Sequence, residues 1–171
     1  MTPEFSRPVR IDALGEGGRT LSIEADDKER AALAARFGLI ALDALSAEAT
    51  LRREADLLFA EGRIKASVMQ ACVASGVPVP ATIEEPFTLR FVPEGEGIEE
   101  IELDAEDFDT IDYAGGAIDL GEAVAETLAL SLDPFPRSPD ADAILKAAGV
   151  LSEDEVVSGP FAALKALKDK L

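Results

Sequence analysis

Alternation of apolar and polar residues between positions 82 and 91 constrains the fold of this chain more than any other feature. The apolar positions are Ile83, Phe87, Leu89 and Phe91, and the polar positions are Thr82, Glu84, Thr88 and Arg90. Successive side chains of an extended chain point to opposite sides, so this segment predicts a strand with one buried and one exposed face. Pro86 has no backbone N–H and predicts an edge or strand-start position.

Further segments predict an antiparallel sheet with helices. Residues 19–25 alternate in the same way, and residues 39–73 contain two extended runs that we expect Gly62 to separate. Residues 27–37 predict a helix that is capped by Asp26 or Asp27 and ends at Gly38. A second helix is expected to begin at Asp119 and to end before the Asp133–Pro134 pair.

These elements predict an α+β fold with a curved antiparallel sheet or partly open β-barrel and two to three helices, since regular strand–helix alternation is missing. The chain has 171 residues, which suits one domain. We expect this domain to cover residues 1–137. Three prolines between residues 134 and 139 introduce a tail over residues 138–171, whose last part, 161–171, predicts a short helix.

Charge is the second informative feature. The chain has 16 Lys plus Arg and 34 Asp plus Glu, a net charge of −18. Residues 94–112 contain many carboxylates and neither Lys nor Arg, which is typical of a solvated loop or exposed edge. Within this segment we select Glu99, Glu100, Asp107 and Asp109 as candidate partner-binding residues. The net charge of −18 opposes non-specific binding of the chain to nucleic acid.

Basic side chains on neighbouring predicted strands offer a different surface. Arg63 and Lys65 share one face of a strand, and Arg90 lies on the strand that follows. These three residues are the candidate RNA-binding set, because a small basic patch can contact RNA phosphates.

The chain has no histidine and one cysteine, Cys72, which excludes a disulfide framework, a Cys/His zinc site and a His-based triad. We expect Cys72 to be buried and inert. The spacing of Asp119 and Glu122 is better explained by helix capping than by a paired-carboxylate active site. We therefore predict no catalytic residue, no metal and no cofactor. The chain shows no membrane-spanning run, so we expect a cytoplasmic protein.

Several segments together resemble the YceD family. They are Gln70–Val73, Pro78–Pro80, Glu85–Phe91, the helix start Ile118–Glu122 and the leucine-rich run with prolines at 128–137. The resemblance covers roughly residues 5–137, and residues 161–164 also resemble proteobacterial members. It implies a role in the accumulation of large-subunit ribosomal RNA, hence in ribosome biogenesis, without an established enzymatic activity.

Two mechanisms are compatible with this resemblance. In the first, the acidic segment binds a basic partner, a ribosomal protein or a pre-ribosomal particle. In the second, the protein contacts ribosomal RNA directly through Arg63, Lys65 and Arg90. The net charge and the scarcity of aromatic side chains for base stacking favour the first.

Overall fold

Three long strands form the centre of the computed structural model, which describes residues 3–15, 17–54, 57–94 and 109–150. They are β3 (Ala41–Glu54), β4 (Leu57–Ala71) and β5 (Pro78–Pro93), and β2 (Arg19–Glu24) and β6 (Asp109–Tyr113) complete a sheet of order β2-β3-β4-β5-β6. All neighbours are antiparallel except β5 and β6, which are parallel. A separate two-stranded sheet pairs β1 (Pro8–Arg10) with β7 (Ala117–Asp119).

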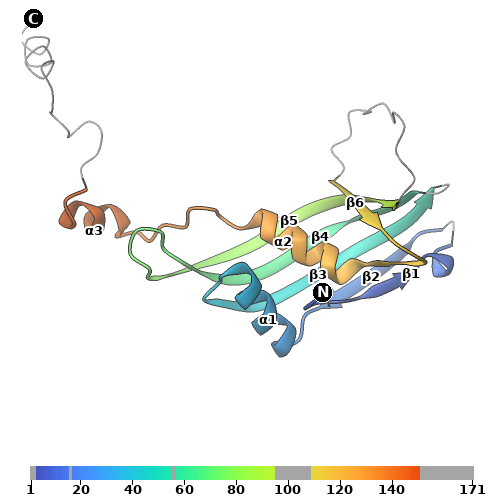
Figure 1. The fold of residues 1–171 in the computed structure, drawn as a ribbon, viewed down its shortest axis with the longest axis horizontal. Helices are drawn as coiled ribbons and strands as arrows, with labels where there is room; N and C mark the ends of the chain where they lie inside the picture. The colour runs from blue at the N-terminus through green and yellow to red at the C-terminus, as the bar shows by residue number, and fades with distance from the viewer. Residues whose placement is uncertain (1–2, 16, 55–56, 95–108, 151–171) are drawn as a thin grey trace, which may run out of the picture.

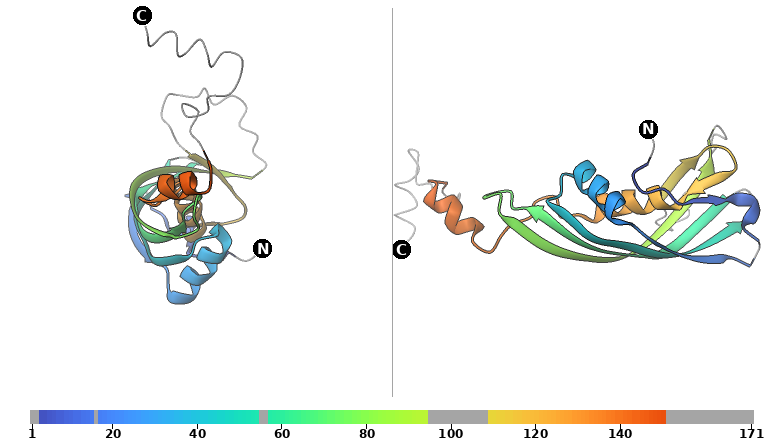
Figure 2. Two further views of the ribbon diagram at one scale, coloured as in Figure 1. Left: turned by 90° about the vertical axis from the view of Figure 1, so that its left-hand side faces the viewer. Right: turned by 90° about the horizontal axis from the view of Figure 1, so that it is seen from below.

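The sheet is elongated and curved, and the helices α1 (Asp27–Phe37) and α2 (Leu120–Ser131) lie on its concave side (Figures 1 and 2). A short 3₁₀ turn (Ile11–Ala13) follows β1, and α3 (Ala141–Ala147) lies beyond the end of the sheet. Within the described residues β2 and β6 are edge strands and do not pair with each other. The predicted α+β fold with a curved antiparallel sheet is therefore confirmed.

Alternation along the strands places one set of side chains in the core. Leu58, Ile64 and Val68 of β4 are each at most 1% exposed, and so is Phe91 of β5. The predicted stripe of α2 packs against this layer, since Leu120, Val124 and Leu128 are completely buried. Burial of these apolar side chains is the main favourable contribution to folding.

The first helix has the predicted ends. The Asp26 carboxylate accepts hydrogen bonds from the backbone N–H groups of Lys28 and Glu29, and the Glu29 carboxylate accepts one from the N–H of Asp26. Gly38 ends the helix with φ of +65°, a left-handed conformation that glycine adopts readily. Arg7 donates to both Glu29 oxygens, at 2.6 and 2.8 Å, and holds the pKa of Glu29 below its usual value.

Pro86 occupies the predicted edge position. β4 lies along one edge of β5, and β6 pairs with the other edge only over Leu89–Pro93. At Pro86 this second edge of β5 is therefore not paired with any described strand. A proline nitrogen carries no hydrogen, and an unpaired edge is where a strand tolerates this loss.

The position expected for Gly62 is wrong, because Gly62 lies inside β4 opposite Ala49 of β3 and Phe87 of β5. A Cβ atom at this position would lie 2.2 Å from the Glu48 carbonyl oxygen and 2.8 Å from the Phe87 ring. Glycine is therefore required by close packing between strands and does not mark a turn.

The C-terminal part is described only to Val150. α3 was not expected from the sequence, and the helix expected at residues 161–171 lies outside the described ranges. The proline-rich segment before α3 is ordered against the sheet: the Gln70 amide donates to the Asp133 carbonyl and the Val73 N–H to the Pro136 carbonyl, both at 2.9 Å. The domain boundary at residue 137 stays a prediction.

We predict that Gly62→Ala lowers the free energy of unfolding by about 2–3 kcal/mol, because the added methyl group must displace the β3 backbone or the Phe87 ring. Urea unfolding measures the change. Gly116→Ala is the matched control, since nothing lies within 4 Å of its added Cβ, and its effect should stay within about 0.5 kcal/mol. Equal stabilities of the two variants would contradict this account of Gly62.

Candidate interaction faces

The side of the sheet opposite the helices is made by the second set of alternating side chains, and we call it the outer face. Its members include Thr20, Ser22 and Glu24 of β2, Ser46, Glu48, Thr50, Arg52 and Glu54 of β3, Phe59, Glu61, Arg63, Lys65 and Ser67 of β4, and Thr82, Glu84, Pro86, Thr88 and Arg90 of β5. Pairing across the ladder arranges them in rows perpendicular to the strands. Charged and hydroxyl side chains therefore dominate this surface.

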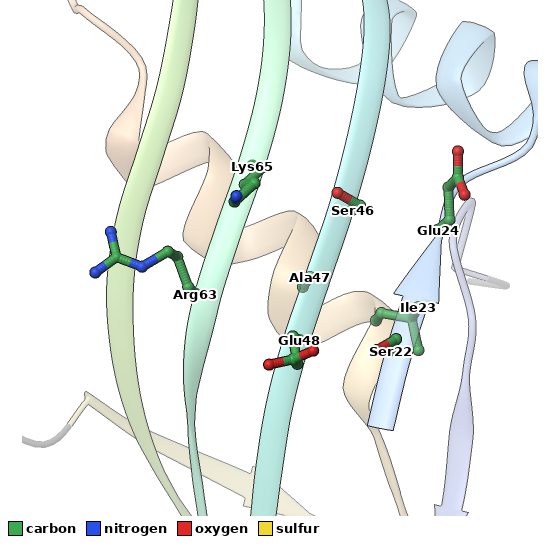
Figure 3. Close-up of a pocket in the computed structure, with 8 residues that line it drawn as sticks. All are labelled: Ser22, Ile23, Glu24, Ser46, Ala47, Glu48, Arg63 and Lys65. Atoms are coloured by element: carbon green, nitrogen blue, oxygen red, sulfur yellow. The ribbon is translucent and has the colours of Figure 1, made fainter. Parts of the chain in front are cut away.

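Arg63 and Lys65 project from β4 next to a groove of about 520 Å³ on the outer face (Figure 3). The groove extends across β3 to β2, where Ser46, Glu48 and Glu24 line it. The Glu84 carboxylate lies on the other side, 3.4 Å from Lys65 Nζ and 4.0 Å from an Arg63 nitrogen. The predicted pair thus shares one face, and a glutamate balances part of its charge.

Arg90 lies apart from this pair. Arg63 is opposite Pro86, and Arg90 is four residues farther along β5, about 13 Å at the usual rise of a strand. Its guanidinium donates to the Thr110 hydroxyl of β6 at 2.9 Å. The structure therefore brings two of the three candidate RNA-binding residues together and places the third in another row.

The row to which Arg90 belongs was not predicted from the sequence. Phe59 of β4 lies between Arg52 of β3 and Arg90 of β5 in the ladder, and the Arg52 guanidinium carbon is 5.9 Å from the centre of the Phe59 ring. Arg52 also forms ion pairs with Glu54 and Glu61. The alternation of the strand could have indicated it. Phe59 is two residues before Glu61 and four before Arg63, so the three side chains lie on the same face.

Of the candidate acidic residues, Glu99, Glu100 and Asp107 lie outside the described residues. Asp109 is the first residue of β6 and is exposed. It lines a second groove, of about 390 Å³, between β5 and α2. The described end of the acidic segment is thus an exposed edge strand, one of the two environments expected for it.

Cys72 follows β4 and is 3% exposed, which confirms that it is buried. The Ser138 N–H donates to its sulfur at 3.3 Å. The Ser138 hydroxyl is also buried, and it has no hydrogen-bond partner among the described residues. The neighbouring polar groups of Ser138, with a smaller effect of Ser75, favour the thiolate and lower the pKa of Cys72 to about 6. Its lack of reactivity stays a prediction.

Asp119 and Glu122 have separate structural partners. The Asp119 carboxylate accepts from the N–H groups of Gly121 and Glu122, at 3.0 and 3.2 Å, and so caps α2 as predicted. It also accepts from the Ser6 hydroxyl at 2.5 Å and the Arg7 N–H at 2.7 Å. A capping role for Glu122 is wrong, because its carboxylate pairs with Arg36 of α1 at 2.7 Å and raises the Arg36 pKa.

The family model described as "Large ribosomal RNA subunit accumulation protein YceD" matches residues 60–168, more than half of the chain. The chain belongs to the YceD family. The match starts inside β4, so it includes Arg63, Lys65, Arg90 and Asp109 but neither β2 nor β3. Comparison with curated proteins and with solved structures gave no match.

Family membership indicates a role in the accumulation of large-subunit ribosomal RNA. Across residues 3–150, apart from the three gaps, no three Asp, Glu or Cys side chains are grouped to hold a metal ion. The same residues include no helix with the length and hydrophobicity of a transmembrane segment.

We predict that the Cys72 environment makes stability depend on pH. Folding lowers the pKa of the Cys72 thiol from about 9 to about 6. The ionised thiolate therefore contributes to the free energy of unfolding in full above pH 9, and this contribution is lost as the pH falls through 6. The difference in free energy of unfolding between the wild type and Cys72→Ala should therefore grow from pH 6 to pH 9 in urea titrations under reducing conditions. Val73→Ala, an exposed neighbour, should show no such trend. A constant difference for Cys72→Ala would argue against the lowered pKa of the Cys72 thiol.

Proposed function

We propose that this YceD-family protein supports accumulation of large-subunit ribosomal RNA as a non-enzymatic binding factor in the cytoplasm. Its acidic surface binds a basic ribosomal protein, free or in a pre-ribosomal particle, and the action requires neither metal nor cofactor. The residue types support a non-enzymatic role, since the chain has no histidine and a single cysteine. The commonest general base and most nucleophile–base pairs are therefore missing.

The lack of excess positive charge on the described strands of the outer face is the observation that carries this proposal. On β2 to β5 its acidic members are Glu24, Glu48, Glu54, Glu61 and Glu84, and its basic members are Arg52, Arg63, Lys65 and Arg90. Arg63 and Lys65 are close to Glu84, and Arg52 is paired with Glu54 and Glu61. A face on which acids balance bases gives little attraction to RNA phosphates, which reward clustered positive charge.

The charge of the whole chain points to the opposite kind of partner. A protein of net charge −18 attracts a Lys/Arg-rich partner at long range and repels a polyanion. Ribosomal proteins that bind RNA phosphates need a basic surface themselves. An acidic factor can cover such a surface before assembly, and this links protein binding to accumulation of the RNA.

Direct contact with ribosomal RNA is the second candidate, and the Arg52–Phe59–Arg90 row favours it. An aromatic ring flanked by guanidinium groups can stack on an unpaired base while the arginines contact phosphates. Arg63 and Lys65, farther along the same face, would extend the contact.

The acidic residues give the first prediction. Glu99→Gln, Glu100→Gln, Asp107→Asn and Asp109→Asn together should weaken binding to basic large-subunit proteins and flatten its salt dependence, because four attractive charges are lost. Binding is titrated at several salt concentrations with nuclease-treated proteins extracted from purified large subunits. The control replaces Glu24, Glu48, Glu61 and Glu84 by Gln, which changes the net charge equally. Equal weakening by both variants would show that the acidic segment has no special role.

The basic residues give the second prediction. Capture of the partner should survive nuclease treatment and should persist in the Arg63→Ala, Lys65→Ala double variant. If RNA is the partner, nuclease should release the ribosomal components instead, and the double variant should bind RNA more weakly. Its salt slope should then fall by about 0.7 to 0.9 per lost phosphate contact. That combination of results would replace the proposed function by the second candidate.

A further inference from the structure

The groove that contains Asp109 differs in chemistry from the groove on the outer face. It has a volume of about 390 Å³ and lies between residues 85–88 of β5 and the C-terminal half of α2, where Thr127, Leu130 and Ser131 line it. We call it the β5–α2 groove. It opens beside the stretch of β5 that β6 does not cover.

An exposed leucine is the main apolar feature of this groove. Leu130 is 79% exposed, although Leu128, two residues earlier on α2, is completely buried. Pro86 and the nearly buried Phe87 supply apolar surface from the strand opposite. A large aliphatic side chain presented to a groove with an apolar wall is typical of a binding surface.

The groove also carries unbalanced negative charge. Glu85 and Asp109 line it, and none of its lining residues is basic. Neither carboxylate has an ion pair or side-chain hydrogen bond with any residue in the described part of the chain. On the outer face, by contrast, Glu84 is close to both Lys65 and Arg63. Two free carboxylates beside an apolar surface are complementary to an apolar side chain flanked by positive charge.

The strand edge makes recognition through side chains more favourable than strand addition. A strand added by a partner would lie along the same edge of β5 that β6 pairs with over Leu89–Pro93, beyond the end of β6. Pro86 lies within the groove and has no N–H to donate, which interrupts a main-chain ladder there.

From these observations we propose that the β5–α2 groove is the docking site for a segment of the basic ribosomal partner in which an aliphatic or aromatic side chain is flanked by Lys or Arg. The apolar side chain contacts Leu130, and the cationic groups pair with Glu85 and Asp109. This inference rests on the proposed function and names the part of the surface that performs it.

Two segments of this chain are alternative occupants. Residues 95–108 include neither Lys nor Arg but several carboxylates, so Glu85 and Asp109 repel this segment. The C-terminal segment 161–171 has Lys165, Lys168 and Lys170 among apolar residues and therefore has matching chemistry. The experiment below distinguishes residues 161–171 from a ribosomal protein by identifying which peptide lies next to Leu130.

The test uses the full-length protein and nuclease-treated proteins from purified large subunits. Leu130→Ser and Glu85→Gln together should weaken capture of basic proteins by at least about tenfold, since the apolar contact and one ion pair are lost. Phe135→Ser with Glu48→Gln is the matched control, because Phe135 is 71% exposed outside the groove and Glu48 is an exposed strand glutamate. The control should bind like the wild type, and circular dichroism checks that both variants are folded.

A photo-crosslinking amino acid in place of Leu130 then identifies the occupant by mass spectrometry. The expected product joins position 130 to a Lys- or Arg-containing peptide of a large-subunit protein. Crosslinks only to residues 161–171 of the same chain, or undiminished capture by the groove variant, would overturn the docking site while leaving the proposed function intact. If the wild-type protein captures no large-subunit protein, the proposed function itself fails.

Discussion

The alignment of β4 between β3 and β5 is the constraint on which the rest of the structure depends. β4 pairs with both neighbours over most of its length, and its side chains alternate between the core and the outer face. A shift by one residue would move Ile64 and Val68 to solvent and Arg63 and Lys65 into the core. Gly62 strengthens this alignment, because only a residue without a side chain fits opposite Ala49 and Phe87.

Much of the fold could be predicted from the sequence because its signals are local. Alternation identified β2 and parts of the three long strands but not the short strands β1, β6 and β7, and cap residues located the ends of α1 and the start of α2. Gly62 was misread because a glycine required by close packing looks the same in sequence as a glycine in a turn. The ion pair of Glu122 with Arg36 and the pairing of β1 with β7 depend on distant partners, and no local pattern identifies them.

The candidate sites could be predicted only in part, for the same reason. The alternation of side chains along β4 correctly predicted that Arg63 and Lys65 share a face. The separation of Arg90 from this pair follows from the register between β4 and β5, which the sequence does not show. The exposed Leu130 was not recognised because an apolar residue near the end of an amphipathic helix is normally assigned to its buried stripe. Only the arrangement of α2 beside β5 shows that Leu130 and Asp109 line one groove. Charge composition indicated the class of partner, whereas the place of contact required the tertiary structure.

The hydrogen bonds of Asp119 to Ser6 and Arg7 have a consequence for synthesis of the protein. These contacts join residues separated by 113 and 112 positions, and β1 pairs with β7 across a similar interval. A growing chain gains about 5 to 20 residues per second. The N-terminal segment, including the buried Phe5, therefore waits on the order of ten seconds for its partners to emerge from the ribosome. Its final docking is a late folding event that the local helix and hairpins precede.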